Sequence, residues 1–177
     1  MNPDDVETWK RALLRFRESK DAFFKKDPSS PFGHGEFAGL KYFDPDPDFR
    51  FETELHRNPA ASSMMMTTSK GTRQLFNTVG YFELSIERKV VRMNAYQSAE
   101  RDDPSIFVPF RDATSGVESY GAARYLDLEV EPNDKYAVDF NYAYNPYCAY
   151  SDAFVCPLPP RENWLTVAIV AGEKSYH

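Results

Sequence analysis

The chain has 177 residues, of which 42% are hydrophobic and 15% aromatic, and its 21 basic and 27 acidic residues give a net charge of −6. A chain of this length buries roughly two thirds of the surface that it exposes when unfolded, so we expect a single domain over residues 1–177. The acidic balance disfavours a nucleic-acid partner, because neutralising phosphates takes clustered Lys and Arg.

Membrane and export signals are also missing from the sequence. No apolar run approaches the ~20 residues that span a bilayer, and the first residues, MNPDDVETWKR, contain no apolar signal segment. We therefore expect a cytoplasmic protein with no membrane partner, in which cysteines are more often thiols than disulfides.

The N-terminal segment has the pattern of an amphipathic helix. Asn2 can cap this helix, with Pro3 in its first turn. The pattern predicts a helix over Pro3–Lys25, within an N-terminal part of residues 1–27, with Lys10, Arg11, Arg15 and Arg17 largely off its apolar stripe. The side chains at helical spacing that form the stripe are Val6, Trp9, Leu13, Phe16 and Phe23.

From residue 37 onward the pattern changes to the period of two that is typical of strands. The alternating segments are 49–55, 64–68, 73–78, 82–86, 91–95, 105–110, 124–130, 136–141 and 164–170. The polar turn ERK predicts a hairpin between 82–86 and 91–95. With one helix and about eight or nine short strands, the sequence predicts a mainly β (α+β) fold. We expect residues 37–177 to form an antiparallel β-barrel, or alternatively a barrel-like sandwich, with two long irregular loops.

The first irregular loop, residues 111–124, is longer than a hairpin needs, and long ordered loops often carry function. Arg111 and Arg124 can bind the carboxylate or phosphate of a small anionic molecule, or can form ion pairs with Asp112 and Glu118. Asp112 and Glu118 are also candidates for a general acid and base.

The second irregular loop, residues 141–163, begins NYAYNPYCAYSDAFVCPLPP. Its tyrosines can plug the end of a barrel or line a pocket with apolar walls and a few polar points. If the two loops meet, they form one ligand site. The candidate ligand-binding residues are Arg111, Ser115, Tyr120, Arg124, Asn141, Tyr144, Asn145, Tyr147 and Tyr150.

Cys148 and Cys156 allow several interpretations. They can be buried thiols, a disulfide closing a short loop, or a site in which Cys148 is a nucleophile activated by a histidine. A zinc site would need about two more ligands, and no histidine stands at a recognised spacing, so no metal site is predicted. The sequence identifies no cofactor.

Two long motifs resemble a known family. FVPFRDATSGVESYGAARYLDLE and DFNYAYNPYCAYSDAFVCPLPPRENWLTVAIVAGEK, together with FAGLKYFDPDPDFRFE, closely resemble the bacterial and archaeal family called domain of unknown function 1684. The resemblance implies no activity, but it implies that polar residues recur in both loops. Ala123 and Trp164 depart from the family pattern. The residues that match its motifs are Arg111, Asp112, Thr114, Gly116, Glu118, Tyr120, Gly121, Arg124, Asn141, Tyr144, Asn145, Pro146, Cys148, Tyr150, Cys156, Pro157, Pro159, Pro160, Glu162 and Asn163.

Three functional hypotheses follow from the sequence. The first is a protein or enzyme that binds a small anionic molecule between residues 111–124 and 141–163. The second is a non-enzymatic interaction module in which the same residues form a closed structural lock. The third is a metal- or thiol-dependent enzyme that uses Cys148 and Cys156.

Overall fold

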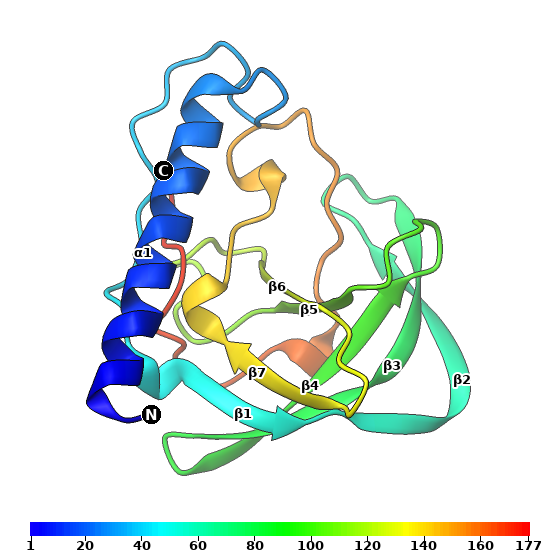
Figure 1. Ribbon diagram of the computed structural model, residues 1–177. Coiled ribbons are helices and arrows are strands. Elements are labelled where there is room, and N and C mark those ends of the chain that lie inside the picture. The colour runs from blue at the N-terminus through cyan, green and yellow to red at the C-terminus, as the bar shows by residue number, and fades with distance from the viewer.

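The N-terminal helix α1 (Pro3–Lys26) lies along one side of the molecule in the computed structural model, which describes residues 1–177 (Figure 1). The Asn2 side chain accepts a hydrogen bond of 2.9 Å from the backbone N–H of Asp5, and Pro3 occupies the first helical position. These contacts satisfy a free donor at the helix start, as a helix cap should. The predicted helix is confirmed. No helix in this structure has both the length and the apolar composition that crossing a membrane requires.

The buried face of α1 differs from the predicted stripe. Phe16 and Phe23 are 44% and 38% exposed, whereas Arg17 is only 7% exposed and Phe24 is buried. The packed face follows the spacing of Leu13, Arg17 and Phe24, and it places a guanidinium group at its centre. The prediction was wrong here because α1 packs partly on backbone carbonyl groups, which an arginine satisfies and an apolar residue does not.

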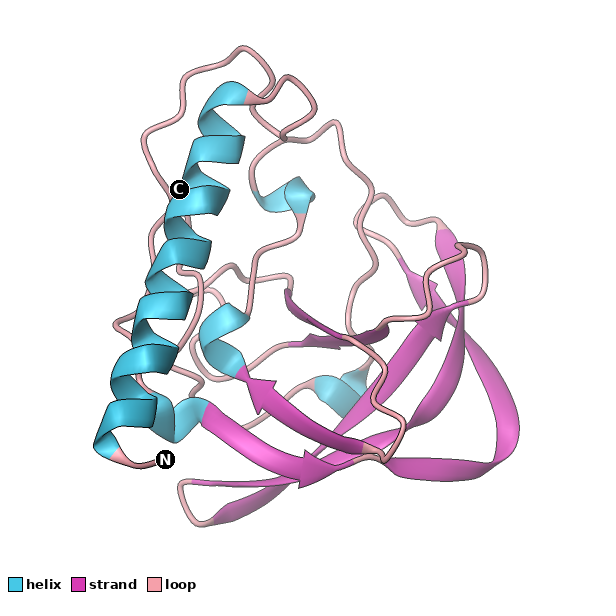
Figure 2. Ribbon diagram, in the orientation of Figure 1, coloured by secondary structure: helices cyan, strands magenta, loops and turns pink.

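Seven strands form two antiparallel sheets (Figure 2). One sheet has five strands in chain order, a meander in which each strand pairs with the next. Its strands are β2 (His56–Thr67), β3 (Arg73–Ile86), β4 (Lys89–Ser98), β5 (Ile106–Phe110) and β6 (Arg124–Leu128). The second sheet pairs β1 (Arg50–Glu54) with β7 (Lys135–Asp139). The mainly β (α+β) class is therefore confirmed, with fewer strands than expected.

The predicted hairpin joins β3 to β4. Glu87 and Arg88 both have positive φ, 51° and 63°, which is the backbone of a two-residue turn whose twist matches the strands. Leu84 then pairs with Val91, as the alternation requires. The segments 73–78 and 82–86 were predicted as two strands, but they are one. A register shift between Thr78 and Gly80 bends β3 without ending it.

The structure contains no closed barrel, which corrects the first choice made from the sequence. β6 and β7 are both edge strands and do not pair with each other. The inter-strand edge of β6 is taken instead by Tyr144, whose backbone exchanges hydrogen bonds of 2.8 and 3.0 Å with Tyr125. The irregular segment after β7 thus occupies the place where a barrel would have closed.

Residues 164–170 do not form a strand either. Val167, Ile169 and Ala171 are buried with the expected period of two. The backbone of this segment, however, bonds to the loop after β5: Ala113 donates to the Val167 carbonyl at 2.9 Å. The alternating pattern correctly predicted which residues of this segment are buried. The segment bonds to a loop, however, and not to a strand.

The main core lies between the two sheets and the C-terminal segment and contains 19 buried residues. Five side chains of this cluster are completely buried: Phe82, Met93, Phe110, Val138 and Phe140. Two smaller apolar clusters lie on the opposite face of the five-stranded sheet. The sheet is therefore covered on both faces, and its second face is covered by the irregular segment. In Figure 1 this segment, coloured yellow to orange, lies between α1 and the strands.

Gly172 tests how tightly the C-terminal segment is packed. Its φ is +81°, and an added Cβ would lie 2.6 Å from the carbonyl oxygens of Phe140 and Ala143. We expect Gly172→Ala to lower the free energy of unfolding by more than the ~1–3 kcal/mol that positive φ alone costs. Gly71→Ala is the matched control, because Gly71 has φ +75° with open space around it. Urea denaturation measures both variants, and equal losses would contradict the close packing at Gly172.

Candidate functional site

Arg124 and Asp112 form a buried ion pair rather than an open binding site. Arg124 is 1% exposed, and its Nη2 lies 3.1 Å from Asp112 Oδ1. The same guanidinium group donates to three backbone carbonyls, those of Ile169 at 2.7 Å, Ala171 at 2.5 Å and Glu173 at 3.3 Å. Burial lowers the pKa of Arg124, and the charge of Asp112 opposes that shift. This guanidinium is occupied by protein acceptors and holds the C-terminal segment in place.

The Asp112 carboxylate is likewise surrounded by protein donors. It accepts hydrogen bonds from the Ile169 backbone N–H at 2.7 Å, from the Thr114 hydroxyl at 2.8 Å and from the Ser115 hydroxyl at 3.3 Å. Its side chain has no solvent exposure. Asp112 therefore orders the turn at 112–115 and has no open face to offer a substrate.

The other charged candidates of the first loop lie apart from this pair. The Arg111 guanidinium lies 4.5 Å from the centre of the Trp164 ring and is half-exposed. Glu118 is exposed, and its backbone carbonyl accepts a hydrogen bond from Ser175. The structure therefore brings Asp112, Ser115 and Arg124 together but gives Arg111 and Arg124 no partner in common.

A second buried charge, Glu173, joins the helix to the irregular segment. It is 1% exposed and forms a salt bridge with Lys20 of α1. Its other carboxylate oxygen accepts from the Asn145 backbone N–H at 2.8 Å and from the Tyr150 hydroxyl. Asn145 and Tyr150, two of the predicted ligand contacts, thus bind a carboxylate of the protein itself.

Asn141 and Tyr147 also have partners within the protein. Asn141 is buried and its side chain bonds in both directions with the backbone of Asp46, at 2.9 and 2.8 Å. Tyr147 packs edge-on against Phe24, with ring centres 5.9 Å apart. These two candidates hold the irregular segment against its neighbours.

Tyr144, by contrast, lines a pocket. The pocket has a volume of about 140 Å³ and lies on the face of the five-stranded sheet that turns away from the main core. Its aromatic wall consists of Phe76, Phe107, Tyr125 and Tyr144. The Phe107 and Tyr125 rings are 4.7 Å apart, and the Tyr125 and Tyr144 rings are 5.7 Å apart. Successive edge-to-face contacts of this kind fix the wall in shape.

The charged side chains of this pocket are Arg101, Asp103 and Asp127. The Tyr144 hydroxyl donates to Asp127, whose carboxylate lies against the rings although much of the residue is open to solvent. Desolvation raises the pKa of Asp127, and the hydrogen bond from Tyr144 offsets part of that rise. Two carboxylates and one guanidinium give the pocket a net negative charge.

Sequence reasoning missed most of this pocket, although one signal for it was present. In the strand RYLDL, Arg124 and Leu126 face the core, so Tyr125 and Asp127 must share the other face. Arg101 and Asp103 belong to the turn before β5, where no periodicity exists to place them. Glu173 was also missed, because its salt-bridge partner Lys20 lies far away in the sequence.

Cys148 and Cys156 lie together behind the Tyr125 ring. Both belong with Tyr125 and Ala123 to one apolar cluster, and both are free thiols. The Tyr120 hydroxyl lies 3.8 Å from Cys148 Sγ. No group of three or more His, Cys, Asp or Glu side chains is arranged to hold a metal ion. The two loops therefore do meet, through Tyr120 and Cys148.

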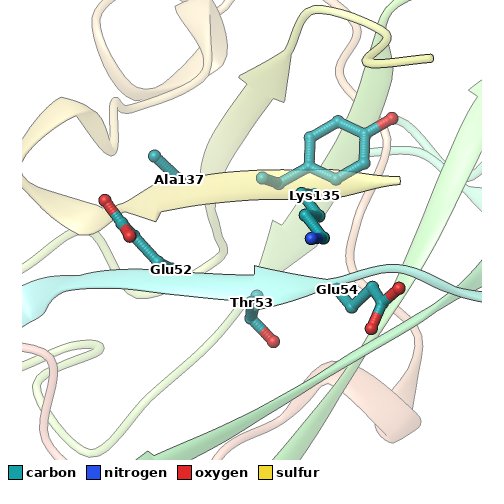
Figure 3. Close-up of a pocket in the computed structure, with 6 residues that line it drawn as sticks. Glu52, Thr53, Glu54, Lys135 and Ala137 are labelled. Carbon is teal, nitrogen blue, oxygen red and sulfur yellow. The ribbon is translucent and has the colours of Figure 1, made fainter. Parts of the chain in front are cut away.

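A further hollow of about 440 Å³ lies along the paired strands β1 and β7 (Figure 3). Its lining side chains include Glu52, Glu54 and Lys135, all exposed, so it is a wide surface depression with charged edges. It contains none of the predicted site residues. Because its only large apolar side chain is Tyr136, it lacks the apolar walls that ligand pockets need.

Comparisons with known proteins agree with the resemblance described above. The family model "Protein of unknown function (DUF1684)" matches residues 35–174. The fold is similar to the solution NMR structure of an uncharacterized protein from Haloarcula marismortui, with 37% sequence identity and a TM-score of 0.74. That match covers 98% of this chain and 99% of the other. None of the curated proteins matches the sequence.

The two arginines of the first loop should differ sharply in their effect on stability. Arg124→Ala leaves Asp112 buried without its partner, so we expect a loss of about 3–5 kcal/mol in the free energy of unfolding. Arg111→Ala removes a half-exposed cation–π contact, so we expect a loss below about 1 kcal/mol. Urea denaturation followed by tryptophan fluorescence measures both.

If Arg124→Ala does not fold, Arg124→Lys provides the comparison, because lysine keeps the charge but cannot reproduce the planar set of donors. Similar stability losses for the variants at positions 111 and 124 would contradict the assignment of Arg124 as the anchor.

Proposed function

Since the chain belongs to DUF1684, a family defined only by unknown function, we propose a function from the pocket at Tyr144: the protein binds a small molecule that carries an ammonium group. The observation that carries this proposal is the combination of a wall of four aromatic rings with the carboxylates of Asp103 and Asp127.

The aromatic wall supports a cationic ligand for an electrostatic reason. The face of an aromatic ring is negative, so a cation over it gains roughly 0.5–2 kcal/mol depending on desolvation. Tyr144 already makes such a contact, since Lys20 Nζ lies 4.9 Å from its ring centre. A bound ammonium group would meet further rings, those of Phe107 and Tyr125, together with the carboxylate of Asp127.

The pocket volume limits the size of the ligand. At about 140 Å³ the pocket is smaller than the roughly 300–1,000 Å³ of sites for drug-sized molecules. A methylated ammonium group with a short extension is therefore the appropriate class.

Arg101 at the same pocket supports a ligand with a second, negative group. Its guanidinium has no ion-pair partner among the salt bridges of the protein, although Asp103 lines the same pocket. A zwitterion with a carboxylate beside its ammonium group would use both signs of charge. The anionic ligand expected from Arg111 and Arg124 has less support, because Arg124 is already bound to protein acceptors.

Three probes of related structure test the proposal: tetramethylammonium, acetate, and glycine betaine, which joins the two groups. We expect NMR titration to show saturable shifts of Tyr125, Asp127 and Tyr144 with tetramethylammonium, and tighter binding with glycine betaine. Asp127→Asn should weaken tetramethylammonium binding about 10-fold, or ~1.4 kcal/mol. Asp102→Asn is the matched control, since Asp102 is exposed and does not line the pocket.

The result that overturns this proposal is binding of acetate alone, or no saturable shift with any of the three probes. Acetate binding would instead support the small anionic ligand that the sequence predicted. Absence of all binding would favour the interaction module, in which the Arg124 network is a structural lock and no ligand is needed.

The pH dependence of tetramethylammonium binding provides a separate prediction. The cation needs ionised Asp127, so affinity is complete above the pKa of this residue and is lost as pH falls through it. Because that pKa is raised, the loss begins at a higher pH than for an ordinary aspartate of pKa about 3.9. Asp103 stays ionised to lower pH, because hydrogen bonds from Ser105 lower its pKa. Asp127→Asn should abolish the early loss, which isothermal titration calorimetry across pH measures.

A further inference from the structure

Cys148 and Cys156 are held in fixed positions by different parts of the fold. Cys148 lies in the short turn Tyr147–Ala149, closed by a hydrogen bond of 3.0 Å from the Tyr150 N–H to the Tyr147 carbonyl. Cys156 is fixed by the turn between β2 and β3: its N–H donates to the Ser69 hydroxyl at 3.1 Å, and its carbonyl accepts from the Ser69 N–H at 2.9 Å.

The two sulfur atoms differ in exposure and in their hydrogen bonds. Cys148 is half-buried, whereas Cys156 is buried, with 8% exposure. The Tyr120 hydroxyl lies 3.8 Å from the Cys148 sulfur, and Cys156 packs in the same side-chain cluster. The Tyr120 hydroxyl and the Cys156 thiol each carry a proton that a Cys148 thiolate can accept in a hydrogen bond, which favours the thiolate form.

The charge state of the pair follows from these contacts. Hydrogen bonds from Cys156 first, and from Tyr120 and Ser69 in addition, lower the pKa of Cys148 to about 6 against the opposing effect of burial. The same interaction raises the pKa of Cys156 above that of an ordinary thiol. At neutral pH the pair is therefore one accessible thiolate beside one protonated thiol, which is the arrangement of an attacking and a resolving cysteine.

We propose that Cys148 and Cys156 form a dithiol site that reduces a small hydroperoxide, with Cys148 as the attacking thiolate and Cys156 as the resolving thiol. The Cys148 sulfur attacks one oxygen of hydrogen peroxide, so that an S–O bond forms, the O–O bond breaks and hydroxide leaves. Cys148 becomes a sulfenic acid, oxidised by two electrons, and the peroxide accepts those electrons.

The second step uses Cys156. Its thiol gives its proton to the departing hydroxide, and the resulting thiolate attacks the Cys148 sulfur. The S–S bond forms as the S–O bond breaks, and the second hydroxide leaves. One thiolate, one thiol and one peroxide thus yield one disulfide, one water and one hydroxide. The cycle closes when an external dithiol, dithiothreitol in the test below, reduces the disulfide.

A small oxidant fits this site better than a protein disulfide. Cys148 is half-buried, and the rings of Tyr147 and Phe154 belong to the same apolar cluster as the two cysteines. The Tyr120 hydroxyl is placed to donate to the oxygen that leaves during the first step. Ser69 fixes Cys156 through hydrogen bonds to its backbone.

The test begins with the reduced protein and one equivalent of hydrogen peroxide. We expect intact mass to fall by two hydrogen atoms per chain and both thiols to disappear, at a rate at least ~10-fold above that of free cysteine. Cys156→Ser should instead gain one oxygen at Cys148, trapped by dimedone, and Cys148→Ser should do neither. Dithiothreitol should restore the starting mass of the wild-type protein.

A pH profile provides a readout that does not depend on any variant folding. The rate of Cys148 alkylation by iodoacetamide should rise with a midpoint near pH 6 in the wild-type protein. Tyr120→Phe should move this midpoint upward and slow the peroxide reaction. Tyr147→Phe is the matched control, because the Tyr147 hydroxyl bonds to neither sulfur, and its profile should match the wild type.

Three outcomes would overturn the dithiol proposal. These are an alkylation midpoint near the ordinary thiol pKa of about 8.5, peroxide reactivity equal to that of free cysteine, and oxidation by oxidised glutathione in preference to peroxide. The proposal does not depend on ligand binding at Tyr144. Failure of the ammonium titration leaves the thiol measurements unaffected, and the reverse also holds.

Discussion

The buried guanidinium group of Arg124 is the contact on which the rest of this structure depends. A charge with 1% exposure is stable only if protein groups replace the water it has lost. Asp112 supplies the opposite charge, and the carbonyls of Ile169, Ala171 and Glu173 accept hydrogen bonds from the two terminal nitrogens. These acceptors come from a segment with no strand pairing of its own. The need to satisfy one cation therefore gives residues 169–173 a defined path through the core.

The same principle orders the rest of the irregular chain, and this leaves aromatic surface free for function. Asn163 bonds to the backbone of Asn94 in both directions, at 2.7 and 2.9 Å, and also to the Pro109 carbonyl at 2.8 Å. Because buried asparagine and carboxylate side chains satisfy the backbone, the tyrosines of the segment need not do so. Tyr144 can thus line a pocket, and Tyr120 can lie beside Cys148. The polar residues stabilise the irregular segments, and the aromatic and thiol groups form the candidate functional sites.

Local periodicity predicted the elements of this fold better than their assembly. The helix, the β3–β4 hairpin, the class of the fold and the two long loops could all be predicted, since each depends on neighbouring residues. Periodicity could not show whether the barrel closes. The edge of β6 is occupied by a single bridge to Tyr144, which leaves no periodic pattern in the sequence. At the candidate site, Arg124 looked like an anion-binding residue because its partners at 169–173 are distant in sequence and are backbone carbonyls, which no side-chain pattern reveals. Tyr144 was predicted as a pocket wall, whereas Arg101 and Asp103 lie in a turn without a readable pattern.

The ion pair between Lys20 and Glu173 joins residues 153 positions apart, and it has a consequence for the order of folding. Helix α1 is synthesised first, yet its packed face, with Arg17 and Lys20 at the centre, has its partners at residues 43, 141 and 173. During translation the packed face of the helix therefore stays in contact with solvent until nearly all the strands have been synthesised. Contacts of such long sequence separation close large loops and slow the folding rate. Until then Leu13 and Phe24, which are buried in the folded protein, stay exposed to solvent.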